Sequence, residues 1–109
     1  LELTDNLRAG CRGMIPGIES LDVQSRIFDL MTSRDPADEA EADRLYAEIL
    51  PMLVFIIQSL DAFICYGKRI AARRLGIGPV HDRQPALRPD PNGLAWAERL
   101  SVQLRPFEI

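Results

Sequence analysis

Apolar residues recur at helical spacing along most of this chain. After Ser20, a stripe with spacings of i, i+4, i+7 and i+8 predicts an amphipathic helix that runs to about Thr32. Its members are Val23, Ile27, Leu30 and Met31. Ser20 can cap this helix. An earlier helix is predicted over Leu1–Ala9, closed by Gly10, because glycine readily adopts a positive φ.

A long helix is predicted to begin at Asp35-Pro36, because the carboxylate can cap a helix and proline suits its first position. Its apolar positions are Ala42, Leu45, Tyr46, Ile49, Leu50, Leu53 and Ile57. Pro51 interrupts this run, and a proline in a helix interior costs ~3 kcal/mol or more. We expect a kink there rather than a second helix, because the apolar phase continues. The residues of Leu53–Ile57 also leave a buried strand open as an alternative.

Two further helices are predicted in the C-terminal half. One begins near Ser59 or Asp61 and ends at Gly76. The other begins at Asp90-Pro91, and its apolar face is formed by Leu94, Ala97, Leu100 or Ser101, and Leu104. Between them, the segment 76–92 carries four prolines, which predicts an extended connection along the surface.

One short segment has the character of a strand. It is Cys11–Ile15, which Pro16-Gly17 ends because proline offers no donor to a ladder. A lone strand cannot pair its own backbone donors and acceptors, and no second convincing strand is apparent. The chain also begins without methionine, inside a periodic segment. We therefore expect a mainly α segment, with one short strand and about five helices, that belongs to a longer protein.

The charge balance argues against several classes of partner. Thirteen basic and sixteen acidic residues give a net charge of -3. The densest basic cluster, Lys68-Arg69 with Arg73-Arg74, falls at a predicted helix C-terminus, where cations complement the helix dipole. We therefore expect no nucleic acid as a partner. The most apolar run, Met52–Ile57, is far shorter than the ~20 residues of a membrane span. With no signal sequence either, we expect a cytoplasmic protein with no membrane partner.

Candidate chemical groups are few. Cys11 and Cys65 lie in apolar contexts without CxxC spacing, which predicts buried free thiols in a reducing compartment. His81 is the only histidine, so we expect no metal site. Lys68 is the only lysine, and the arginines around it indicate a solvent-facing rim rather than a Schiff-base site.

Glu19 follows the predicted strand and allows two interpretations. At the C-terminal end of a strand in an α/β barrel, it would lie on the face where ligands bind. In the first turn of the following helix, it would simply complement the helix dipole. We favour the second interpretation from the sequence alone.

Three stretches, in this order, carry a resemblance to a known family. They are Arg8–Gly17 (RAGCRGMIPG), Leu45–Leu53 (LYAEILPML) and the helix from Lys68 to Leu75-Gly76. With the proline-rich connector and the last helix, they resemble the C-terminal end of the dihydrodipicolinate synthase and N-acetylneuraminate lyase family. These proteins are class I aldolases built on a (β/α)8 TIM barrel with an added C-terminal helical domain.

The resemblance implies that residues 1–33 form the last barrel unit and residues 34–109 the C-terminal helical domain. Cys11–Ile15 would be the eighth barrel strand. The family's Schiff-base lysine and proton-relay tyrosine lie on earlier strands, so no catalytic residue is implied in this chain. The substrate pocket would receive Ile15 (through its main-chain carbonyl), Pro16, Gly17 and Glu19. Pro16-Gly17 departs from the Ser/Thr-containing sequence of the synthases, which favours an aldolase or dehydratase acting on another 2-keto acid.

Two hypotheses follow. The first is the C-terminal segment of a Schiff-base lyase that acts on a 2-keto acid such as pyruvate. Its partner would be the rest of the barrel, in a homo-oligomer, with neither metal nor cofactor. The second is a self-standing helical interaction module that dimerises through the face between Leu45 and Ile57 and has no catalytic activity.

Overall fold

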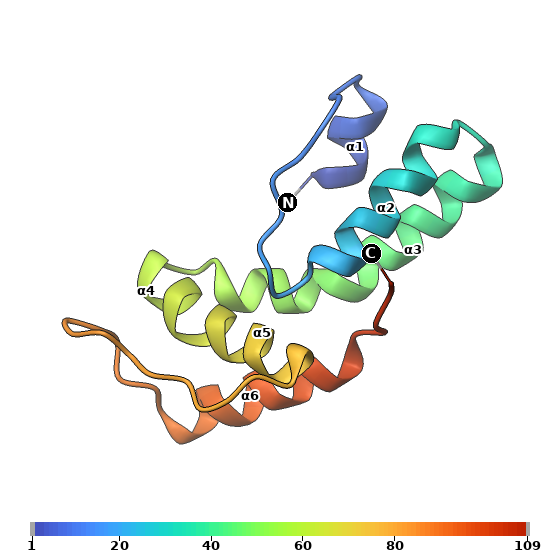
Figure 1. Ribbon diagram of the computed structural model, residues 1–109. Coiled ribbons are helices and arrows are strands. Elements are labelled where there is room, and N and C mark those ends of the chain that lie inside the picture. Colours follow the sequence, from blue (N-terminus) through green and yellow to red (C-terminus); the bar gives the residue numbers. More distant parts are fainter. Residues whose placement is uncertain (1, 109) are drawn as a thin grey trace. The chain divides into compact units, whose positions relative to one another are not determined.

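The computed structural model describes residues 2–108, and its fold is mainly helical (Figure 1). Residues 2–108 contain no β-strand. The elements are α1 (Leu3–Arg8), α2 (Leu21–Ser33), α3 (Pro36–Ile56), α4 (Leu60–Ala62), the π-helix η1 (Phe63–Gly67), α5 (Lys68–Leu75) and α6 (Pro91–Gln103). Because α4, η1 and α5 follow one another without a break, the described residues form five helical stretches, as the sequence predicts.

The chain divides into two units, which we describe separately. The first unit contains the residues up to Leu50 and the tail from Arg105 onward, and the second contains Pro51–Leu104. The division falls at Pro51, inside α3. The predicted domain boundary between residues 33 and 34 is a different one. It applies to the whole barrel enzyme that the resemblance implies, and it stays a prediction.

The core of the first unit contains the stripe predicted for α2. All four members of this stripe are buried, together with Leu7 of α1 and with Leu45 and Ile49 of α3. α1 packs against α2. Arg8, at the end of α1, pairs with Glu39 and with Asp43 of α3. This pairing with Arg8 holds the pKa of Asp43 below its ordinary value.

The turn from α2 to α3 is set locally. Arg34 ends α2 with a φ of 58°, a left-handed conformation that few residues other than glycine adopt. The next residue, Asp35, accepts a hydrogen bond at 2.8 Å from the backbone N–H of Ala37. The predicted cap and helix start are therefore confirmed.

α3 continues through Pro51 as one helix. Its fully buried residues are Ala42, Leu45, Ile49, Met52 and Ile56, each at most 1% exposed. They recur at alternating spacings of three and four, so the stripe keeps its phase across the proline. The strand alternative for 53–57 is wrong. The sequence pattern places Leu53 and Ile57 on the apolar face of the helix, but Leu53 is half-buried and Ile57 is 48% exposed.

In the second unit, α5 packs against α6, and η1 contacts both α4 and α6. The buried side chains of η1, α5 and α6 include Cys65, Tyr66, Ile70, Ala71, Ala97 and Leu100. Three predicted helix ends are confirmed here. Ser59 accepts a hydrogen bond from the N–H of Ala62 at 3.0 Å, and Asp90 accepts one from the N–H of Gly93 at 2.7 Å. Gly76 ends α5 with a φ of 67°.

Two predictions about the N-terminal part are wrong. Residues 11–17 have no regular secondary structure, so the predicted strand at Cys11–Ile15 is not formed. The physical reason is that a strand needs a hydrogen-bonded neighbour, and the described chain supplies none. Cys11 is exposed, so the prediction of a buried thiol is correct only for Cys65.

Among residues 2–108, no single helix is long and apolar enough to cross a bilayer. By length and composition alone, one bent pair, Pro36–Ile56 with Leu60–Leu75, passes the same test.

Candidate functional site

The four residues predicted to line a substrate pocket lie between α1 and α2. The Ile15 side chain is fully exposed, whereas Glu19 is only 3% exposed. Pro16 and Gly17 are half-buried. The four residues therefore differ widely in burial. Their role in a substrate pocket stays a prediction.

A hollow lies between this segment and α2. It is lined by Gly13, Met14, Pro16, Leu21, Ser25, Phe28 and Asp29. Met14 and Pro16 therefore face α2, while Ile15, between them, is exposed to solvent. This alternation is typical of an extended chain, in which successive side chains point to opposite faces. The segment has the side-chain pattern of a strand without the hydrogen bonds of one.

Gly17 is required for the position of the Glu19 carboxylate. A Cβ atom at Gly17 would lie 2.3 Å from both carboxylate oxygens of Glu19. α2 begins at Leu21 with Ser20 at its N-cap, so Glu19 precedes the helix. Our interpretation of Glu19 as an acid in the first turn is therefore wrong. The other interpretation, a ligand-facing acid at the end of a strand, stays a prediction.

In the second unit, Asp82 joins the connector to the start of α5. Its Oδ1 accepts a hydrogen bond from Lys68 Nζ at 2.8 Å, and its Oδ2 accepts one from Arg69 Nη2 at 2.6 Å. Lys68 also donates to the carbonyl oxygen of His81 at 2.7 Å. The hydrogen bonds from Arg69, and next from Lys68, hold the pKa of Asp82 far below its ordinary value. Lys68 is therefore an ion-pair partner rather than a free amine.

Beside this ion pair lies the Cys65 thiol, which is buried. Arg69 Nη1 donates to the Cys65 carbonyl oxygen at 2.8 Å and lies 3.5 Å from Cys65 Sγ. Burial nevertheless raises the pKa of this thiol. Cys65 is consequently a packing residue rather than a reactive nucleophile.

Three aromatic rings, which the sequence pattern does not predict to meet, form a cluster in the second unit. The ring centroids of Phe55 and Tyr66 lie 5.1 Å apart, and those of Phe55 and Trp96 lie 6.3 Å apart. The three rings line a groove beside the start of α6. Arg99 lies 3.8 Å from the centroid of the Trp96 ring, a cation–π distance, and so covers one of its faces. The rings come from three separate helices, so spacing along the chain gives no signal for the cluster.

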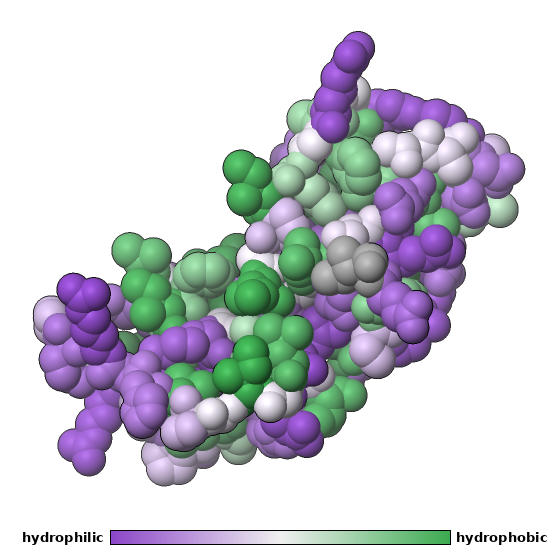
Figure 2. All heavy atoms as spheres, viewed as in Figure 1, coloured by the Kyte–Doolittle hydropathy of each residue, from purple (hydrophilic) through white to green (hydrophobic). Residues whose placement is uncertain are grey.

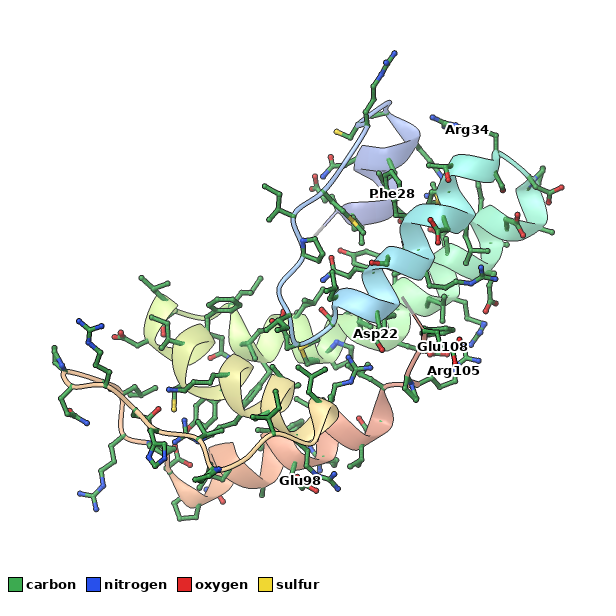
Figure 3. All side chains as sticks on the ribbon, viewed as in Figure 1. Asp22, Phe28, Arg34, Glu98, Arg105 and Glu108 are labelled. Atoms are coloured by element: carbon green, nitrogen blue, oxygen red, sulfur yellow. The ribbon has the colours of Figure 1, made fainter. Side chains whose placement is uncertain are left out.

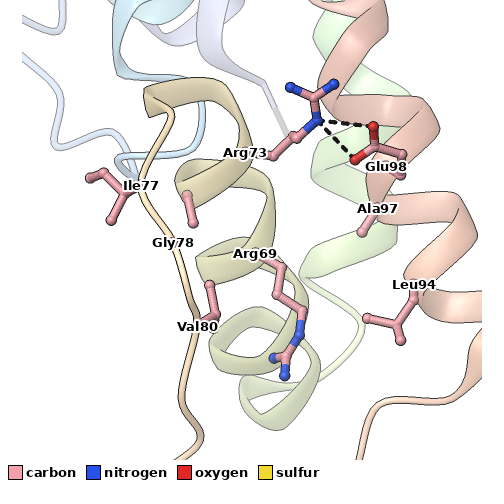
Figure 4. A pocket seen from close by; sticks show the side chains of 9 residues that line it. Arg69, Arg73, Ile77, Gly78, Val80, Leu94, Ala97 and Glu98 are labelled. Atoms are coloured by element: carbon pink, nitrogen blue, oxygen red, sulfur yellow. Dashed lines mark hydrogen bonds and ion pairs between the residues drawn. The ribbon is translucent and has the colours of Figure 1, made fainter.

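A second hollow of this unit lies between α5, the connector and α6 (Figure 4). Two arginines line it, and both are engaged. Arg73 Nε donates to the two carboxylate oxygens of Glu98 at 2.9 and 3.1 Å, and Arg69 is paired with Asp82. With their charges matched in this way, the arginines do not form a site for an anion.

Residues 2–108 contain no group of three or more His, Cys, Asp or Glu side chains that could hold a metal ion. Comparison with known proteins adds no relative: no protein family, curated protein or solved structure matches this chain.

Proposed function

We propose that this chain is the C-terminal segment of a Schiff-base lyase similar to dihydrodipicolinate synthase. The segment would supply the last barrel strand, the following helix and the C-terminal helical domain. The parent enzyme would cleave or dehydrate a 2-keto acid such as a pyruvate derivative, acting as a homo-oligomer. The proposal starts from the resemblance carried by Arg8–Gly17, Leu45–Leu53 and Lys68–Gly76.

The observation that supports it most is the exposed, strand-like segment before α2. Met14 and Pro16 lie on α2, and Ile15 points away with its whole side chain exposed. In a (β/α)8 barrel, each strand turns one face to its helices and the other to the barrel interior. An isolated last strand would be expected to have this appearance.

The state of Lys68 supports the second part of the proposal, that the reacting lysine lies outside this chain. A Schiff base requires a neutral amine, usually one activated in an apolar pocket or beside another cation. The Lys68 ammonium is instead held by the Asp82 carboxylate and the His81 carbonyl. We expect no covalent adduct on Lys68 when the chain is treated with pyruvate and borohydride. Peptide mapping by mass spectrometry tests this, with Lys68→Ala as the control. An adduct on Lys68 that this variant lacks would contradict the proposal.

A positive test of the proposal uses a chimera of this chain with a barrel enzyme. The C-terminal segment of a pyruvate-dependent member of the resembled family is replaced by residues 2–108. We expect the chimera to form a borohydride-trappable pyruvate adduct on its own barrel lysine, and the amides of 11–15 to exchange slowly. In the isolated chain these amides should exchange quickly. A matched chimera carrying Ile15→Asp should lose the adduct, since a buried charge would face the barrel interior. Equal adduct formation by both chimeras would count against the proposal.

The interaction module is the alternative, and the structure gives it less support. Its expected dimer interface is the apolar face between Leu45 and Ile57. Leu45 and Ile49 of this face are buried within the chain, Leu53 is half-buried and Ile57 is 48% exposed. Part of the expected interface is therefore already covered within the chain.

A further inference from the structure

The tail of the chain returns to the first unit and contacts both of its longer helices. The backbone N–H of Phe107 donates to Asp22 Oδ2 at 3.0 Å, although the two residues lie far apart in sequence. Arg105 lies between the carboxylates of Glu41 and Glu48, 3.8 Å from each. Figure 3 shows Arg105 and Glu108 beside Asp22, where the tail reaches the start of α2.

The two ion pairs of Arg105 are exposed, long and sensitive to salt. The side chains of Arg105, Glu41 and Glu48 are between 37% and 52% exposed. Exposed ion pairs contribute little, and dissolved salt screens them. Neither ion pair would hold the tail by itself, so we expect them to act together with the hydrogen bond from Phe107 to Asp22.

The carboxylates that receive the tail keep other stabilising interactions when the tail leaves. Arg44 pairs with both Glu41 and Glu48 independently of Arg105. The pKa of Glu41 is lowered mainly by its hydrogen bond from Arg44, with a smaller contribution from the charge of Arg105. Asp22 lies in the first turn of α2, where the helix dipole stabilises a carboxylate without help from Phe107. Opening would thus leave no buried charge without a partner.

From these contacts we propose that residues 105–108 form a releasable strap on α2 and α3. The strap is closed at low ionic strength and opens as salt rises. The surface formed by Asp22, Glu41 and Glu48 binds an arginine side chain together with the backbone N–H of the residue two positions later. In this chain they belong to Arg105 and Phe107. This inference concerns the first unit alone and does not depend on the proposed lyase function.

The test follows the Phe107 amide in the full chain. Labelling with ¹⁵N-phenylalanine gives four amide signals, one for each phenylalanine. Phe107→Leu identifies the Phe107 signal by its loss. At low salt we expect this amide to exchange at least several-fold more slowly than in a free peptide of the tail sequence. It should approach the peptide rate between 0.01 M and 1 M salt, over which the Debye length falls from about 30 to about 3 Å. The Phe28 amide, inside α2, should not respond.

Single-residue variants distinguish release of the strap from a general loss of stability. Arg105→Gln and Asp22→Ala should each bring the Phe107 amide to the peptide rate at low salt. Asp29→Ala, an exposed acid on the same helix, is the control and should leave it unchanged. Arg105 is exposed, so Arg105→Gln keeps the test valid even if Asp22→Ala weakens α2. Exchange at the peptide rate in the unchanged chain, or a slow rate that neither salt nor Arg105→Gln alters, would overturn the proposal.

Discussion

Gly93 occupies a position in the second unit where no side chain fits. A Cβ atom there would lie 2.1 Å from Tyr66 Oη and 2.4 Å from Tyr66 Cζ. Because Tyr66 is buried, its ring has little room to move away. We expect Gly93→Ala to lower the free energy of unfolding by about 1–3 kcal/mol, the usual cost of overpacking. Urea denaturation measures this loss.

Gly13→Ala is the matched control for that substitution. A Cβ atom at Gly13 would have no heavy atom within 4 Å. The change in its unfolding free energy should stay within about 0.5 kcal/mol, as for other surface substitutions. Equal losses in both variants would show that contact with Tyr66 is not the cause.

Asp82 should make the stability of the second unit depend on acid. Its pKa in the folded chain lies below the ordinary value of about 3.9, because Arg69 and Lys68 stabilise the carboxylate. The unfolded state therefore binds protons more readily than the folded state as the pH falls. The stabilisation is complete above the ordinary pKa and is lost as the pH falls toward the folded one.

Thermal melting between pH 6 and pH 2 tests this dependence, over a range set by the ordinary carboxyl pKa of about 3.9. The melting temperature of the unchanged chain should fall more steeply with acidification than that of Asp82→Asn, which lacks the titrating group. Asp61→Asn, an exposed acid of the same unit, should keep the steep profile. Parallel profiles for the unchanged chain and Asp82→Asn would contradict the assignment.

Two of the predicted side-chain caps were correct at this scale, whereas Ser20 lies at the N-cap of α2 but makes no cap hydrogen bond with its side chain. Asp35 and Asp90 cap the helices that the sequence assigns to them, because a cap depends on neighbours two or three positions away.

The burial of single residues was less predictable. Cys11 was wrongly predicted to be buried, because its exposure depends on what the rest of the chain brings to it. Glu19 was wrongly assigned to the first turn of a helix, because α2 begins only at Leu21. Gly17 makes room for Glu19, and that close approach is visible only in three dimensions.

At the scale of elements, α3 is defined by a buried stripe that crosses Pro51. Ile56 is fully buried near its end, while Val54, two positions earlier, is 46% exposed. We expect Ile56→Ala to cost about 2–5 kcal/mol of unfolding free energy, through lost burial and a cavity. Val54→Ala should stay within about 0.5 kcal/mol. Chemical denaturation of the two variants measures both values, and a similar small loss in both would place the stripe on another face.

The helical elements were largely predictable because periodic apolar spacing and end residues are local signals. The π-helix η1 was not, because it differs from an α-helix in hydrogen-bond register, which apolar spacing does not resolve. The prediction of a strand at 11–15 was wrong for a different reason. Strand pairing is non-local, so a favourable composition cannot form a strand without a neighbour.

At the scale of the whole chain, an apolar surface covers the region of α4 and η1. Its main side chains are Ile57, Leu60, Phe63 and Ile64, which are between 38% and 73% exposed. Figure 2 shows apolar atoms gathered around α4. Contiguous exposed apolar residues are typical of surfaces that another protein part covers. The proposed barrel enzyme would provide such a cover, and the sequence pattern alone did not identify this surface.

This surface should make the isolated chain associate with itself and bind a hydrophobic dye. The double variant Leu60→Ser, Ile64→Ser should reduce both effects and leave the melting temperature almost unchanged, because both side chains are exposed. Ile70→Ser, at a fully buried position of α5, is the contrasting variant. It should lower the melting temperature and increase dye binding, because a buried hydroxyl without a partner disrupts packing. Light scattering and dye fluorescence at matched concentrations measure the outcome. Unchanged association in the double variant would show that another surface is responsible.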